Sequence, residues 1–81
     1  MLNELYEIIT SVYENMNQKF EIPLSDITED TELDTLGIDS LTFVMIMLAI
    51  ENYYKIDMAS DTDICYTTIS DVIRVIKSKL G

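Results

Sequence analysis

Residues 41–54 constrain the fold of this chain more than any other segment. The segment contains neither glycine nor proline, and its only plainly polar residues are Thr42, Glu51 and Asn52. Nothing in it interrupts a helix, because the strongest helix breakers are missing and most of its residues are apolar. The sequence therefore predicts a largely apolar helix over about 40–54.

The residues just before this segment place a serine at the start of the helix. Gly37 breaks the structure that precedes it, and Asp39 is a residue type that favours helix N-caps. Ser40 then lies in the first turn, close to unpaired backbone N–H groups and the positive end of the helix dipole. A phosphate attached to its hydroxyl would lie in a favourable electrostatic setting.

At 100° per residue this helix carries two apolar stripes on roughly opposite sides. The first stripe contains Phe43, Ile46, Met47, Ile50 and Tyr54, and the second contains Leu41, Val44, Met45 and Leu48. A helix that is apolar all round is usually buried all round, but 81 residues hardly suffice to surround one. We predict that the first stripe faces the core and the second is exposed or meets a partner. The alternative is that Met45 and Leu48 are only core or crystal-contact residues.

An amphipathic helix and a long connection precede this segment. In residues 2–16 the apolar side chains follow alternating steps of three and four, which predicts a helix. They are Leu2, Leu5, Ile9, Val12 and Met16. In the connection 18–38, Pro23 blocks helix continuation and a short helical turn is expected near 24–27. Scattered apolar residues predict that this loop is packed onto the core.

Two further helical segments follow the central helix. Ser60 or Asp61 is placed to cap a short helical turn over about 61–66. Residues 68–71, Thr-Ile-Ser-Asp, have the spacing of a capping box, which predicts a final helix over about 69–79. No strand-like alternation is convincing. The prediction is an all-α fold with three main helices, one short helix and a long packed loop between the first two.

Length, charge and residue types exclude several functional classes. Eighty-one residues predict a single domain, 1–81, and we expect a monomer. Fifteen acidic residues against five basic ones give a net charge of -10, which argues against binding nucleic acid or an anionic membrane unaided. We also expect no membrane insertion. Without histidine, the chain has no serine–histidine or cysteine–histidine catalysis and no histidine metal site. We therefore expect no catalytic residues and no metal.

The single cysteine and the apolar segments indicate where the protein resides. Cys65 has no partner for an internal disulfide, which is compatible with a reducing cytosol, and we expect it to be partly buried and unreactive. The longest apolar stretch, 43–50, is too short to span a bilayer. The acidic start of the chain resembles no targeting peptide. These features predict a cytoplasmic protein.

The segment Leu36-Gly37-Ile38-Asp39-Ser40-Leu41 resembles the L-G-x-D-S-L signature of acyl carrier proteins and related peptidyl carrier (thiolation) domains. Residues 27–33 and 67–69 resemble the loop before that signature and the start of the last helix in the same family. The resemblance implies that a phosphopantetheinyl transferase attaches 4'-phosphopantetheine, donated by coenzyme A, to Ser40. The terminal thiol then carries acyl or aminoacyl groups as thioesters between a loading enzyme and downstream synthase or transferase enzymes. The competing interpretation of Ser40 is an ordinary helix-start serine.

The resemblance also assigns roles to residues around the serine. It implies that Asp39 helps the transferase to dock, besides acting as an N-cap, and that Leu41 is an exposed contact. Carriers of fatty acid synthesis often have acidic residues where this chain has Thr42, Met45 and Asn52. The acidity here lies instead in the preceding loop, at Asp26, Glu29, Asp30, Glu32, Asp34 and Asp39. The predicted partner-binding residues are Asp39, Leu41, Thr42, Val44, Met45 and Leu48.

This departure favours a specialised pathway, of the nonribosomal peptide or polyketide type, over primary fatty acid synthesis. Primary fatty acid synthesis is the first alternative. The second, from another class, is an acidic helical interaction module whose Ser40 is never modified.

The resemblance also implies a cleft that shelters cargo. In the family, residues at the positions of Ile50, Met58 and Tyr66 surround this cleft, and the tyrosines of this chain narrow it.

Overall fold

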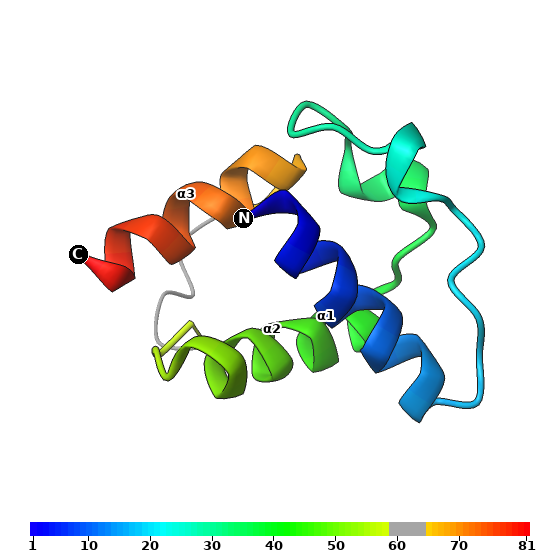
Figure 1. The fold of residues 1–81 in the computed structure, drawn as a ribbon, viewed down its shortest axis with the longest axis horizontal. Coiled ribbons are helices and arrows are strands. Elements are labelled where there is room, and N and C mark those ends of the chain that lie inside the picture. Colours follow the sequence, from blue (N-terminus) through cyan, green and yellow to red (C-terminus); the bar gives the residue numbers. More distant parts are fainter. Residues whose placement is uncertain (59–64) are drawn as a thin grey trace.

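The residues that the structure describes form three α-helices, with one long loop between the first two (Figure 1). The computed structural model describes residues 1–58 and 65–81. Helices α1 (Leu2–Asn15) and α2 (Ser40–Tyr54) are joined by a long loop that contains two short 3-10 turns, η1 (Leu24–Asp26) and η2 (Leu33–Leu36). Helix α3 (Ile69–Leu80) follows α2 in the sequence. The described residues contain one isolated β-bridge, Glu32–Thr68, and no strand. The all-α prediction and the three main helices are confirmed.

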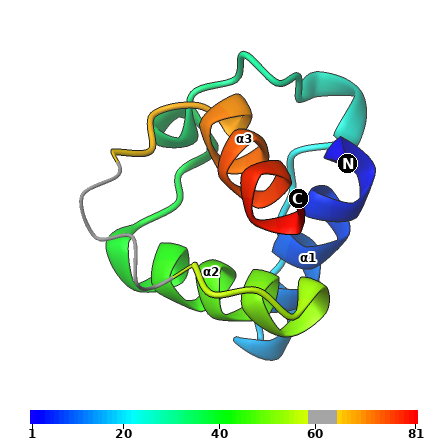
Figure 2. The same cartoon turned by 90° about the vertical axis from the view of Figure 1, so that its left-hand side faces the viewer.

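The helices surround one core, with α1 packed against α2. Helix α3 lies across that core from α2 in two perpendicular views (Figures 1 and 2). The short helix expected over about 61–66 lies outside the described residues, except for Cys65 and Tyr66, which are not helical.

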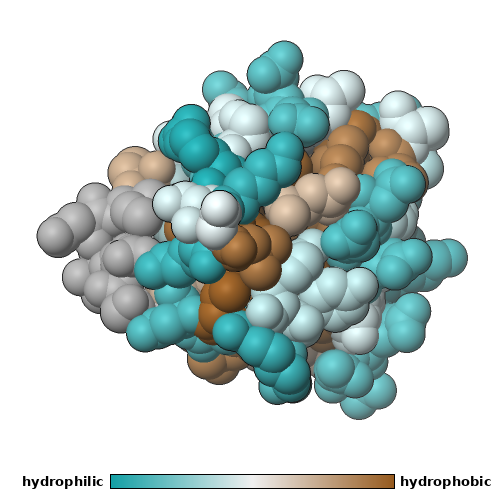
Figure 3. All heavy atoms as spheres, turned by 60° about the vertical axis from the view of Figure 1, so that its left-hand side comes forward, coloured by the Kyte–Doolittle hydropathy of each residue, from teal (hydrophilic) through white to brown (hydrophobic). Residues whose placement is uncertain are grey.

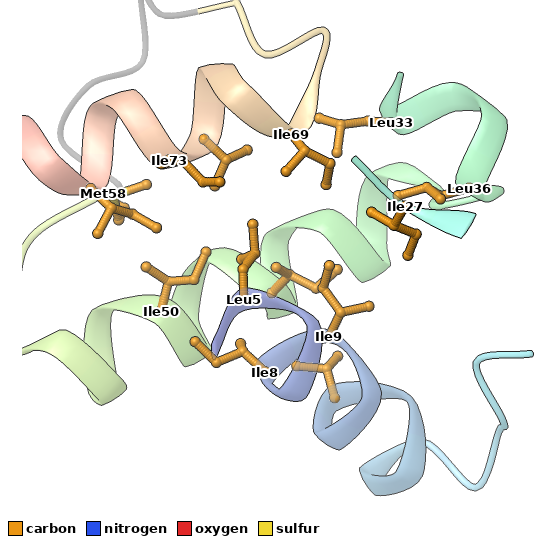
Figure 4. Close-up of a cluster of buried hydrophobic side chains, with 14 of the residues drawn as sticks. Leu5, Ile8, Ile9, Ile27, Leu33, Leu36, Ile50, Met58, Ile69 and Ile73 are labelled. Carbon is orange, nitrogen blue, oxygen red and sulfur yellow. The ribbon is translucent and has the colours of Figure 1, made fainter. Parts of the chain in front are cut away.

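Each helix contributes branched aliphatic side chains to the core (Figure 4). Leu5 of α1, Ile50 of α2, and Ile69 and Ile76 of α3 are almost completely inaccessible to solvent. The long loop adds Ile27, Leu33 and Leu36, which are also buried. Because apolar burial is the main favourable term in folding, these loop residues fix the loop to the helices. The prediction of a packed loop is thus confirmed.

Aromatic residues of α1 hold the first part of this loop. The Tyr6 hydroxyl donates a 2.7 Å hydrogen bond to the carbonyl oxygen of Ile22. The ring of Phe20 packs against Tyr6 and Tyr13, with centroid distances of 5.9 and 5.0 Å. Turn η1 lies where a short helical turn was predicted, whereas η2 was not predicted from the sequence.

The second part of the loop pairs with the start of α3. The Leu33 N–H donates to the Thr67 carbonyl oxygen, and the Ile69 N–H donates to that of Thr31, at 2.9 and 3.0 Å. The Asp71 carboxylate accepts hydrogen bonds from the N–H groups of Thr67 and Thr68, so the predicted capping box is confirmed. The loop that leads to Ser40 is therefore fixed to α3 as well as to α1.

Candidate functional site

A glycine sets the direction in which the chain enters α2. Gly37 ends η2 in the left-handed conformation, with φ 72°, and its N–H donates to the Asp34 carbonyl oxygen. A residue with a Cβ is strained at this φ, so glycine is the favoured residue here. The change of direction separates η2 from α2 and leaves Asp39 and Ser40 at the surface.

Asp39 is the N-cap of α2, as the sequence predicted. Its Oδ1 atom accepts a 2.8 Å hydrogen bond from the Thr42 N–H. Hydrogen bonds from the backbone and side chain of Thr42 lower the pKa of Asp39 below its usual value. Asp39 therefore remains ionised at neutral pH, and its negative charge stays next to Ser40 in the chain.

Ser40 is the first residue of α2 and is exposed to solvent. Within residues 1–58 and 65–81, no hydrogen bond occupies its hydroxyl. The first turn of a helix also has a positive electrostatic potential, because its N–H groups have no intrahelical partners. The side chain is thus accessible to a modifying enzyme and lies in a setting that favours a phosphate ester.

An open groove of about 370 Å³ lies beside Ser40. It combines residues of η2 and α2 with Tyr66, which is far from both in the sequence. The Phe43 and Tyr66 rings pack against each other in it, with their centroids 5.5 Å apart. The groove is lined by Leu33, Asp34, Ile38, Asp39, Ser40, Phe43, Val44 and Tyr66. An extended group on Ser40 therefore has a surface with both apolar and polar walls beside it.

The second apolar stripe of α2 is largely exposed, as expected. Leu41, Val44 and Leu48 keep 67%, 54% and 55% of their surface accessible, and Met45 is half-buried against the core. Brown apolar side chains reach the surface between teal hydrophilic ones on the face drawn in Figure 3. An exposed group of large apolar side chains is typical of a contact surface.

The prediction that Thr42 belongs to this surface is wrong. Only 4% of Thr42 is accessible, and its N–H is occupied by the Asp39 cap. Two residues along a helix correspond to a rotation of 200°, so Thr42 points away from the side that carries Ser40. Its hydrogen bonds instead hold the residue that precedes the serine.

Two other expectations are corrected. Cys65 is exposed rather than partly buried.

The second correction concerns the residues expected around a cargo cleft. Ile50 and Met58 are buried in the core, while Tyr66 lines the groove beside Ser40. The interior cavity between α1, α2 and α3 measures only about 10 Å³, which is about the space of one water molecule. Among the described residues, this cavity is therefore too small to hold cargo.

Metal-binding clusters and bilayer-spanning helices are both absent from the described residues. Within residues 1–58 and 65–81 there is no group of acidic or cysteine side chains arranged to hold a metal ion. None of the helices in the same residues has the length and hydropathy that a bilayer-spanning helix needs. The surroundings of Ser40 are thus the main candidate site.

Comparisons with known proteins identify a family for most of the chain. A family model described as "Phosphopantetheine attachment site" matches residues 10–76. The acyl carrier protein of Rickettsia massiliae (strain Mtu5) is 38% identical over 74 residues, which cover 90% of this chain and 86% of that protein. An orsellinic acid synthase of Armillaria ostoyae is 40% identical over 55 residues, 68% of this chain. The 5-methylorsellinic acid synthase of Aspergillus terreus is 34% identical over 56 residues. The chain spans about 2% of the length of either synthase.

Proposed function

We propose that this chain, which belongs to the phosphopantetheine-attachment family, carries its 4'-phosphopantetheine on the Ser40 hydroxyl. Membership follows from the family match over residues 10–76. Proteins of this family are carriers that hold the group covalently, and carrier domains interact with synthase and transferase enzymes. The observation that supports Ser40 is its exposed side chain at the N-terminus of α2, inside the matched region.

The residues around Ser40 fit this group. Its phosphate end suits the first turn of α2, where the helix dipole is positive. Its extended amide-containing part suits the adjacent groove, whose walls include Ile38, Phe43 and Tyr66 as well as polar Asp34 and Asp39. When attached, the group supplies a terminal thiol that carries cargo as a thioester.

The protein residues contribute positioning and recognition. Asp39 and Gly37 fix the start of α2, so that Ser40 is presented in one orientation to the transferase. The exposed apolar side chains of α2, Leu41, Val44 and Leu48, provide the contact for the loading enzyme and the downstream enzymes, together with half-buried Met45. Tethering raises the effective concentration of the cargo at each docked enzyme, without chemistry by the chain itself. In this proposal the chain is a non-catalytic monomer that acts as one domain, 1–81, in the cytoplasm.

The proposed pathway is a specialised one, of the nonribosomal peptide or polyketide type. Support comes from α2, whose exposed side near Ser40 is apolar. This helix has Met45 and Asn52 at positions where carriers of fatty acid synthesis often have acidic residues. The likeness to acyl carrier proteins supports primary fatty acid synthesis as the second candidate. Trapping the loaded protein from its native cell and weighing its thioester cargo separates the two. A saturated fatty acyl group would contradict the specialised pathway.

Intact-mass measurement tests the attachment residue. After incubation with coenzyme A and a broadly active phosphopantetheinyl transferase, we expect the wild-type chain to gain one 4'-phosphopantetheine. Ser40→Ala removes the only proposed acceptor and abolishes the gain. Ser78→Ala, which removes an exposed hydroxyl from α3, is the matched control and retains it.

Two outcomes contradict this assignment. A mass gain in Ser40→Ala moves the attachment to another residue. An unchanged mass of the wild-type chain favours the unmodified interaction module instead, for which Met45→Glu destroys partner binding while Ser40→Ala leaves it intact.

A further inference from the structure

A second groove, of about 440 Å³, lies between α1 and α2. It shares no residue with the groove beside Ser40. Its lining consists of Glu7, Ile8, Ser11 and Asn15 from α1 and Ala49, Asn52 and Tyr53 from α2. We propose that this groove binds an arginine side chain that a partner protein presents, as a contact separate from the surface beside Ser40.

The floor of the groove suits the aliphatic part of an arginine. Ile8 is buried, and Ala49 is half-buried beside it. Ala49 has a small side chain in a helix that is otherwise rich in large apolar residues, so space stays open between the two helices. The methylene groups of arginine pack favourably on such a surface while the charged end reaches polar groups.

The walls of the groove provide acceptors for a guanidinium group. Glu7 contributes a carboxylate, and Asn15 and Asn52 contribute amide oxygens. In the part of the chain that the structure describes, neither a hydrogen bond nor an ion pair occupies these three side chains. Arginine presents five N–H donors in a planar fork, so several acceptors along one groove favour it over lysine.

The charge around the groove is complementary to a cation. Neither α1 nor α2 contains lysine or arginine, and together they carry four glutamates. Three of the five basic residues of the chain lie in α3, across the core from α2. Lys55, directly after α2, is exposed. A partner that presents an arginine therefore meets a negative potential from these two helices.

Tyr53 adds an aromatic wall whose orientation is fixed. Its ring is 55% exposed and packs edge-on against Tyr54, with centroids 4.8 Å apart. The Tyr54 hydroxyl in turn donates a 2.9 Å hydrogen bond to the Glu4 carboxylate on α1. A guanidinium group stacks favourably on an aromatic face, and a ring that is already oriented loses little entropy on binding.

An NMR titration of the full chain tests the proposal. The probe is N-acetyl-arginine methylamide, and its neutral control of equal shape is N-acetyl-citrulline methylamide. We expect the arginine probe to shift the amide signals of Glu7, Ser11 and Asn52, and the citrulline probe to shift them much less. Glu7→Gln and Tyr53→Ala should each weaken binding of the arginine probe by about two- to five-fold, as expected for an exposed charged contact.

Glu29→Gln is the matched control, because it removes the same charge from the loop beside α3 and leaves the α1–α2 groove unchanged. It should bind the arginine probe like the wild-type chain. Equal shifts with both probes would overturn the proposal, as would equal affinity in Glu7→Gln and wild type. Shifts centred on the acidic loop at residues 26–34 would show instead that the probe responds only to net charge.

Discussion

Helices α2 and α3 differ in how they use apolar residues. In α3 the apolar side chains form one buried stripe, apart from Leu80 at its end, while Arg74 and Lys77 are exposed on the other side. In α2 only Ile46 and Ile50 are fully buried among the apolar residues, and large apolar side chains also cover the exposed side. The core buries only one face of each helix, so the exposed second stripe of α2 is not needed for folding. Its position next to Ser40 supports a role in partner contact.

The clearest test of this difference is to remove apolar atoms from each helix. Ile76→Ala in α3 should lower the free energy of unfolding by about 2–5 kcal/mol, because Ile76 is completely buried and leaves a cavity. Leu48→Ala in α2 should change it by no more than about 0.5 kcal/mol, since more than half of Leu48 is exposed. Urea denaturation measures both. Equal losses would show that the second face of α2 stabilises the fold.

A charge on the exposed side of α2 should separate contact from stability. Val44→Glu should lower the kcat/KM of a phosphopantetheinyl transferase for this chain by about five-fold or more, as for a central interface residue. Its circular dichroism and unfolding midpoint should stay close to those of wild type. Ser78→Glu on α3 adds the same charge and should leave the transferase rate unchanged. If both variants slow the reaction equally, net charge rather than the α2 surface governs docking.

The ends of α1 and α2 offer a finer comparison. Lys55 ends α2 in the left-handed conformation, with φ 59°, and Asn17 follows α1 with φ 57°. Asparagine tolerates this conformation better than lysine. We therefore expect Lys55→Gly to raise the free energy of unfolding by about 0.5–1 kcal/mol and Asn17→Gly to raise it less. A larger gain at Asn17 in urea denaturation would contradict this explanation.

Local patterns predicted the helices well because their end signals are local. Gly37 and Asp39 define the start of α2, and the structure begins the helix at Ser40 as predicted. The exposure of Leu41, Val44 and Leu48 also follows from helical geometry. Thr42 was misplaced because it was assigned to the surface from the family's acidic position two residues after the serine, whereas a 200° rotation turns it away from that side.

The grooves were not predicted, because each joins segments that are far apart in the sequence. Tyr66 reaches the Ser40 groove because residues 29–33 pair with 67–70, a contact that no local pattern encodes. The α1–α2 groove joins Glu7 to Tyr53 in the same way. One signal was present: Glu7, Ser11 and Asn15 follow at steps of four, which places polar side chains on one face of α1.

The carboxylates that cap the starts of α2 and α3, N-cap Asp39 and capping-box Asp71, should give the smallest difference, visible as acid sensitivity. Hydrogen bonds from Thr67 and Thr68 lower the pKa of Asp71 below its usual 3.8, and Arg74 adds an ion pair at 2.7 Å. The pKa of Asp39 is lowered by Thr42 alone. A carboxylate whose pKa is lower in the folded state stabilises the fold above pH 3.8, and this contribution is lost as the pH falls below that value.

We therefore expect Asp71→Asn to reduce the loss of stability between pH 7 and pH 3 more than Asp39→Asn does. Urea midpoints at both pH values for wild type and the two variants measure this difference. Because Arg74 is largely exposed, high salt should weaken the contribution of the Arg74–Asp71 ion pair to stability. The urea midpoints of the two variants should therefore differ less in 1 M NaCl. If Asp39→Asn and Asp71→Asn changed the acid-induced loss of stability equally at low salt, this explanation would be contradicted. The additional partners of Asp71 would then add no acid-sensitive stability to the start of α3.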